Sequence, residues 1–159
     1  MIGKIFKKTV NIPINSINLE GALAIPRDVK GVVVFVHGSG SSRLSPRNQF
    51  VAKTLIRAGF ATLLFDLLTE SEDQIYENRF NIPLLVERLN KATNWLKQRQ
   101  DTRSLAIGYF GASTGAAAAI IGAAERGTEI KAVVSRGGRP DLAGEALLKF
   151  TRVRLTFHQ

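Results

Sequence analysis

Four short, largely apolar runs constrain this chain more than any other feature. They occupy residues 31–36, 60–65, 105–110 and 130–134. A run without polar alternation is typical of a strand that is buried on both faces of a parallel sheet. Segments with helical periodicity lie between the runs, at 46–58, 84–96 and 116–124. This alternation predicts an α/β fold with a doubly wound, mostly parallel sheet and helices on both faces.

The two ends of the chain add further β signals. Two β-rich runs, 4–12 and 17–25, flank the turn-forming stretch Pro13-Ile14-Asn15-Ser16, which predicts an N-terminal β-hairpin. Residues 152–159 alternate like one more sheet strand. A length of 159 residues suits one core and is short for two, so we expect a single domain over 1–159.

Composition narrows the choice of partners. The chain has no cysteine, which excludes disulfides and thiolate metal sites, and we expect no metal or other cofactor. No apolar window approaches the ~20 residues of a membrane span, so we expect a cytoplasmic protein without a membrane partner. The formal charge is +9, but the basic residues are scattered, and the sequence favours nucleic-acid or general anion binding less than small-molecule chemistry.

The motif G-x-S-x-G follows the third apolar run, with Ser113 between Gly111 and Gly115. An alanine-rich helical segment follows it, and strand, tight turn and helix together are the context of a nucleophile elbow. The flanking residues must be small because strand and helix approach closely at such a turn. We therefore expect Ser113 to be a nucleophile. The alternative is that Ser113 only caps the helix.

A second stretch of small residues, His37-Gly38-Ser39-Gly40, follows the first apolar run. Small residues let backbone N–H groups approach a substrate oxygen, so we expect the Ser39 and Thr114 amides to form an oxyanion hole. His37 is expected to pack the loop or contact substrate rather than act as a base. The stretch lacks the third glycine of a dinucleotide loop, and the chain lacks the Gly-Lys-Ser/Thr of a phosphate loop.

These segments resemble the dienelactone-hydrolase-like branch of the α/β-hydrolases. The similarity covers roughly residues 20–150 and lies in four segments, VVVFVHGSGSSRLSPRN, ATLLFDLLTESED, GYFGASTGAAAAI and AVVSRGGRPDLAGEAL. It implies a serine hydrolase that acts on a small ester, lactone or thioester through Ser113. It also implies an acid after a later strand and a histidine in a loop beyond that.

The acid and the histidine have no clear counterparts in this chain. Asp141 follows a predicted strand but also suits the N-cap of a helix starting at Leu142, and His158 is penultimate. Compared with the family, the chain is expected to be C-terminally truncated and weakly active or inactive. The alternative is a catalytically dead binding or interaction module. An uncovered sheet edge predicts a homo-oligomer formed through that edge or the C-terminal strand.

Polar residues near the predicted strand ends are candidates for binding substrate. They are Arg43, Arg47, Asn48, Arg136 and Arg139. If their side chains converge, they bind a carboxylate or phosphate of the substrate. In the alternative interpretation they are solvated or pair with Asp66, Glu70 and Asp73.

Overall fold

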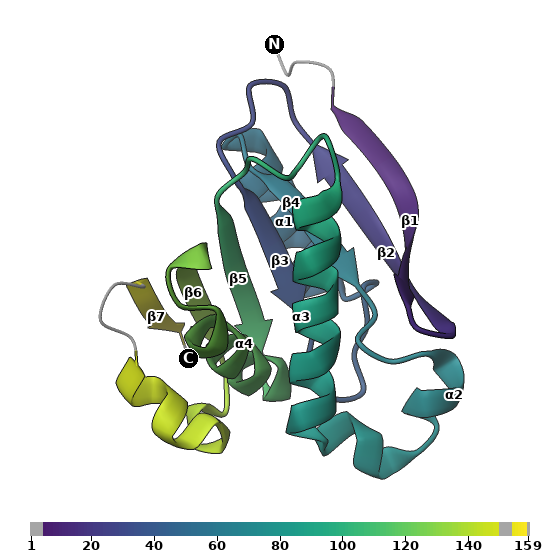
Figure 1. The fold of residues 1–159 in the computed structure, drawn as a ribbon, viewed down its shortest axis with the longest axis vertical. Helices are drawn as coiled ribbons and strands as arrows, with labels where there is room; N and C mark the ends of the chain where they lie inside the picture. Colours follow the sequence, from purple (N-terminus) through teal and green to yellow (C-terminus); the bar gives the residue numbers. More distant parts are fainter. Residues whose placement is uncertain (1–4, 150–153, 159) are drawn as a thin grey trace.

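A seven-stranded sheet forms the centre of the computed structural model, which describes residues 5–149 and 154–158 (Figure 1). The strands are β1 (Phe6–Ile14), β2 (Ile17–Ile25), β3 (Val32–Val36), β4 (Ala61–Phe65), β5 (Ile107–Ala112), β6 (Ile130–Arg136) and β7 (Arg154–His158). Their spatial order is β1-β2-β4-β3-β5-β6-β7. Strand β2 runs antiparallel to β1 and β4, and all the other neighbours are parallel. The predicted α/β fold with a mostly parallel sheet and an N-terminal hairpin is confirmed.

The hairpin is tighter than the sequence predicted. Ile14 pairs with Ile17, so the turn is only Asn15-Ser16, and Asn15 has a positive φ of 51°. The sequence predicts Pro13 and Ile14 in the turn, but both lie in β1. Proline is tolerated there because β1 is an edge strand, where a missing N–H breaks no ladder bond on the open side.

The predicted helices are all present, and shorter ones fill the loops between them. They are α1 (Pro46–Arg57), α2 (Glu70–Asp73), η1 (Tyr76–Phe80), α3 (Ile82–Gln98), α4 (Thr114–Arg126), η2 (Gly127–Glu129) and η3 (Pro140–Lys149), where η marks a 3₁₀ helix. The acidic loop after β4 contains α2 and η1, which the sequence did not predict. Such short helices depend on capping rather than on an apolar stripe, and Thr69 and Glu72 form a capping box at α2.

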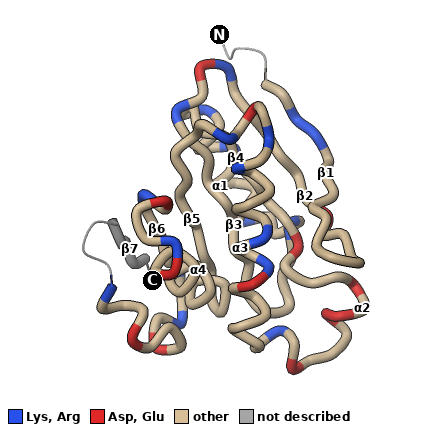
Figure 2. The backbone as a smooth tube through the Cα atoms, in the orientation of Figure 1, with Lys and Arg blue, Asp and Glu red and all other residues tan. Residues whose placement is uncertain are grey.

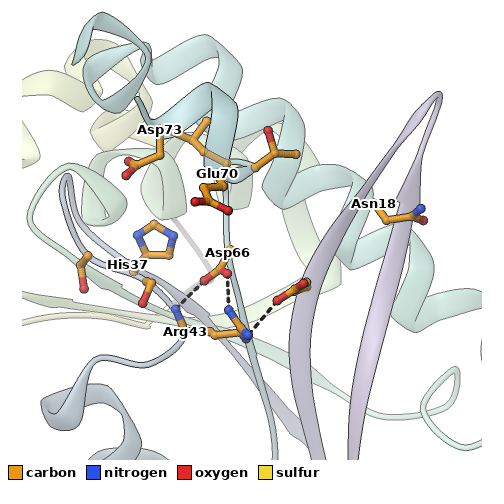
Figure 3. Close-up of a pocket in the computed structure, with 11 residues that line it drawn as sticks. Asn18, His37, Arg43, Asp66, Glu70 and Asp73 are labelled. Atoms are coloured by element: carbon orange, nitrogen blue, oxygen red, sulfur yellow. Dashed lines mark hydrogen bonds and ion pairs between the residues drawn. The ribbon is translucent and has the colours of Figure 1, made fainter. Parts of the chain in front are cut away.

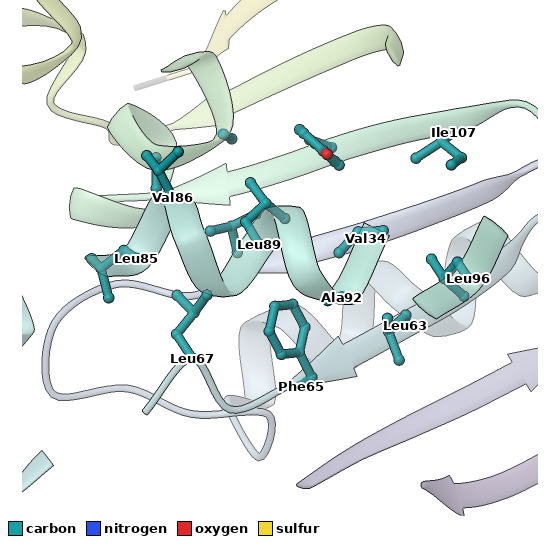
Figure 4. Close-up of a cluster of buried hydrophobic side chains, with 14 of the residues drawn as sticks. Val34, Leu63, Phe65, Leu67, Leu85, Val86, Leu89, Ala92, Leu96 and Ile107 are labelled. Atoms are coloured by element: carbon teal, nitrogen blue, oxygen red, sulfur yellow. The ribbon is translucent and has the colours of Figure 1, made fainter. Parts of the chain in front are cut away.

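The helices cover the two faces of the sheet unequally. The larger core lies between the sheet and the helices α3 and α4, where Val34 and Leu63 from the strands meet Leu89 and Leu96 from α3 (Figure 4). On the opposite face α1 packs Ala52 against the sheet in a much smaller cluster. Strands β3, β5 and β6 are parallel, so their following loops emerge at one edge of the sheet, where the sequence placed its functional residues.

Charge is spread along the described chain rather than gathered on one element (Figure 2). Lys and Arg occur on strands, helices and loops alike, with Asp and Glu between them. None of the described helices combines the length and the apolar character that are needed to cross a membrane.

Candidate active site

Ser113 lies in a strained turn between β5 and α4. Its backbone has φ 54° and ψ −126°, a region that residues with a side chain rarely adopt. The Ser113 hydroxyl makes no capping hydrogen bond to α4, although the residue occupies the N-cap position. The geometry therefore favours the nucleophile elbow over the alternative in which Ser113 only caps the helix.

The two glycines of the motif permit this close packing. A Cβ atom on Gly111 would lie 2.6 Å from the Ala116 Cα, and one on Gly115 would lie 2.1 Å from the Val36 carbonyl oxygen. Both separations are far inside van der Waals contact, so no side chain fits at either position. The first turn of α4 is thereby pressed against the end of β3.

The loop after β3 contacts the elbow directly. The Ser39 amide donates a hydrogen bond to Thr114 Oγ1 at 3.0 Å, so this predicted oxyanion donor already has an acceptor. The Thr114 amide is at the first position of α4, where no intrahelical acceptor exists. A Cβ on Gly38 would lie 2.8 Å from the Ser113 Cβ, so the Gly38 main chain passes close to the nucleophile.

The Gly38 amide is a further main-chain N–H near the elbow, which the sequence analysis did not name. The His37 carbonyl points at α4, since a Cβ on Gly115 would lie 2.4 Å from its oxygen. In a trans peptide the following N–H points the opposite way, so the Gly38 amide faces away from α4. The glycines on both sides of Ser39 did not by themselves indicate the direction of either amide.

His37 holds two loops together and has no free ring nitrogen. Its Nε2 accepts a hydrogen bond from the Leu67 amide at 3.0 Å, so Nδ1 carries the proton and donates to the Gly38 carbonyl at 2.9 Å. Burial lowers the pKa of His37, and the nearby Asp66 and Asp73 only partly oppose this. The structure supports loop packing by a neutral imidazole and gives no support to the expected contact with substrate.

We expect the lowered pKa of His37 to make stability pH-dependent. The unfolded chain takes up this proton at about pH 6.5, before the folded chain does, so stability is full above pH 6.5. As the pH drops below 6.5, the free energy of unfolding decreases by up to about 1.4 kcal/mol per pH unit, until the pH reaches the lowered pKa of folded His37. Urea unfolding at pH 7.5 and 5.5 measures this. His37→Gln keeps an acceptor for the Leu67 amide and should flatten the dependence, whereas an unchanged slope would contradict the assignment.

Arg43 is paired with carboxylates of its own chain. Its main-chain amide donates to Asp66 Oδ1 at 2.7 Å, and its guanidinium pairs with Asp66 and with Glu20 (Figure 3). This matches the alternative in which Arg43 pairs with Asp66, and substrate binding by Arg43 stays a prediction. The bonded residues line a cavity of about 350 Å³ together with Glu70 and other polar side chains.

Arg136, Asn48 and Arg47 do converge. Arg136 Nη2 donates to Asn48 Oδ1 at 2.8 Å, and its guanidinium lies over the Phe110 ring at 5.3 Å. Burial and the charge of Arg47 lower the pKa of Arg136. Within residues 5–149 no carboxylate forms an ion pair with either arginine. The Ser113 amide lies 3.4 Å from the Arg136 carbonyl, so this cationic pair is next to the elbow.

The carboxylate of the candidate acid Asp141 is paired with Arg139. The carboxylate accepts two hydrogen bonds from Arg139, at 3.0 and 2.8 Å, and both side chains are exposed. This pairing lowers the pKa of Asp141 and neutralises Arg139. Asp141 is the second residue of η3, so it does not precede a helix as the predicted N-cap either.

His158, the candidate base, is placed only by its main chain. It ends β7 in register with Arg136, which is itself in register with Ala112 beside the elbow. The position is thus at the same sheet edge as Ser113. The His158 side chain lies outside what the structure describes, so its role stays a prediction.

The fold and the elbow define an α/β-hydrolase, and comparison with known structures identifies the branch. A dienelactone hydrolase from Anabaena variabilis is 43% identical, with a TM-score of 0.86 over 96% of this chain and 85% of that one. The chain therefore belongs to the dienelactone hydrolase family of α/β-hydrolases. Est1E from Butyrivibrio proteoclasticus is 19% identical, with a TM-score of 0.70 over 82% of this chain and 51% of that one, and supports the fold alone.

Curated relatives from two strains of Mycobacterium tuberculosis are 54% identical over 138 residues. Their printed description is "putative phosphoribosyl transferase". The match includes 87% of this chain but only 31% of theirs, so the chain spans about a third of the length of these relatives. No family model matches the sequence.

Proposed function

We propose that this chain is a serine hydrolase of the dienelactone-hydrolase-like type that acts on a small ester, lactone or thioester. The observation that carries the proposal is the positive φ of Ser113 at the tip of a β5–α4 elbow, with a hydroxyl that does not cap the helix. Strain of this kind is maintained where a side chain must be presented to substrate.

The proposed reaction is acyl transfer through Ser113 Oγ. A bond forms between Oγ and the carbonyl carbon, and the carbonyl π electrons move to oxygen. The resulting oxyanion is stabilised by the Thr114 and Gly38 amides. The Ser39 amide can contribute only if its hydrogen bond to Thr114 Oγ1 breaks. Collapse re-forms the C=O bond and breaks the bond to the leaving group, which takes up the proton that Ser113 Oγ releases. Water then hydrolyses the acyl-enzyme.

The proton of Ser113 needs an acceptor, and the described residues place none at Oγ. Both nitrogens of His37 are occupied, and Asp141 is bound to Arg139. A serine without a base is a weak nucleophile, so we propose slow turnover unless His158 supplies the base. This lack of a base favours the second candidate function, a catalytically dead binding module.

The cationic pair beside the elbow supports a substrate with an anionic group. Arg136 and Arg47 have no carboxylate partner among the described residues, and Asn48 orients one guanidinium. A substrate carboxylate placed there gains charge-assisted hydrogen bonds. We therefore propose that esters or lactones bearing a carboxylate are preferred over neutral ones.

Fluorophosphonate labelling followed by peptide mass spectrometry tests the proposal. We expect covalent labelling of Ser113 and complete loss of labelling in Ser113→Ala. A mono-ester of succinate, which keeps one free carboxylate, should slow the labelling at a lower concentration than the neutral diester does. Failure to label Ser113 in a protein that remains folded by circular dichroism would favour the binding module. A cytoplasmic location and a homo-oligomer remain predictions.

A further inference from the structure

The peptide between Gly38 and Ser39 is held at both ends by hydrogen bonds. Its carbonyl oxygen accepts bonds from the Ser41 amide at 3.1 Å and from His37 Nδ1 at 2.9 Å. Its N–H, on Ser39, donates to Thr114 Oγ1 at 3.0 Å. Thr114 is 3% exposed, so little water competes for its hydroxyl. Three bonds therefore fix the plane of one peptide within a loop.

Glycine at position 38 makes this peptide easy to rotate. No side chain fits there, because its Cβ would lie 2.8 Å from the Ser113 Cβ. Rotation of the peptide plane changes ψ of Gly38 and φ of Ser39, and glycine tolerates almost any such change. The close approach to Ser113 requires glycine at position 38, and without a side chain there the rotation of the Gly38–Ser39 peptide is little restricted by steric contacts.

The contacts between elbow and loop divide into two kinds. Gly38 touches Ser113, and Gly115 touches the His37 carbonyl, and both contacts set how near the loop lies. Neither contact sets how its peptides are rotated. The bond from the Ser39 amide to Thr114 Oγ1 is directional and joins residues 75 positions apart in the chain.

We propose that the Thr114 hydroxyl is a positioning group that clips residues 37–40 to the elbow and fixes the plane of the Gly38–Ser39 peptide beside Ser113. The inference rests on the proposed hydrolase function and adds a second role for Thr114. Its N–H faces the developing oxyanion, and its Oγ1 fixes the loop that carries the other donor. Engagement of the Ser39 amide then serves to position the hole rather than to line it.

The test compares Thr114→Val, which removes the acceptor at nearly constant shape, with Thr114→Ser, which keeps the hydroxyl. Amide hydrogen exchange of Ser39, followed by NMR in the resting protein, should be at least about fivefold faster in the valine variant. The rate constant for fluorophosphonate labelling at saturation should fall about tenfold, with little change in half-saturation. Thr114→Ser should restore both values. Thr114→Ala replaces the valine variant if the latter does not fold.

The two measurements separate the ways in which the inference fails. Unchanged exchange of Ser39 in the valine variant would show that the hydroxyl does not hold the peptide. Faster exchange with an unchanged or higher labelling rate would show that the held peptide is not needed for, or blocks, the chemistry. Both outcomes overturn the inference. Absence of labelling in the wild-type protein would instead refute the proposed function, and exchange alone would then decide whether the clip exists.

Discussion

Gly115→Ala is expected to prevent the elbow from forming. The added methyl group would lie 2.1 Å from the Val36 carbonyl oxygen and 2.4 Å from that of His37, and both are backbone atoms. Backbone cannot move aside as a flexible side chain does, so α4 must shift away from β3. We expect a loss of about 3 kcal/mol or more in the free energy of unfolding, measured by urea denaturation. Labelling of Ser113 should be lost in whatever fraction still folds.

Gly108→Ala is the matched control for this substitution, since Gly108 is also a glycine of this strand–helix unit. A Cβ there would lie 3.5 Å from the Ala132 carbonyl oxygen, which is ordinary contact. Replacing glycine by alanine in a strand at such a site is expected to change stability by less than about 1 kcal/mol. If both variants were equally stable, the close approach at Gly115 would not limit the fold.

The elbow was predictable because its determinants are local. An apolar run, two small residues around Ser113 and an alanine-rich segment follow one another in sequence, and each restricts the same turn. The sheet was predictable for a similar reason, because runs buried on both faces occur in parallel sheets. The ends of the strands were less predictable. Pro13 is typical of a turn, but it lies in the edge strand β1, whose open side needs no N–H donor.

Side-chain partners in the site were not predictable in the same way. Arg43 and Arg136 look alike in the sequence, but Arg43 lies between Asp66 and Glu20, whereas Arg136 lies beside Asn48 and Arg47. These neighbours come from other parts of the chain, so the packing of the fold determines which guanidinium is paired with a carboxylate and which is not. The hydrogen bond from the Ser39 amide to Thr114 Oγ1 depends in turn on the rotation of a single peptide.

Glu72→Ala is expected to give the other large effect. Glu72 accepts two hydrogen bonds from Arg88, at 2.9 and 2.7 Å, and Arg88 on α3 is only 7% exposed. Removal of the carboxylate leaves a buried guanidinium without its counter-charge. Arg88 Nε has no hydrogen-bond partner among the described residues either, so nothing else compensates the buried group. We expect a loss of about 3 kcal/mol. The bond to Arg88 lowers the pKa of Glu72, so this stabilisation is present above about pH 4.5 and is lost as pH falls further.

Two controls separate burial of the charge from loss of an ion pair as such. Asp101→Ala breaks a similar two-bond pair with Arg99 on the surface and should cost less than about 1 kcal/mol. Adding Arg88→Met to Glu72→Ala removes the orphaned charge and should recover most of the lost stability. A double variant as unstable as Glu72→Ala alone would show that the carboxylate acts through the Thr69 capping box. The bond between Glu72 and Arg88 also anchors the segment of α2 and η1 next to the candidate site, because Arg79 in η1 lies beside Gly40.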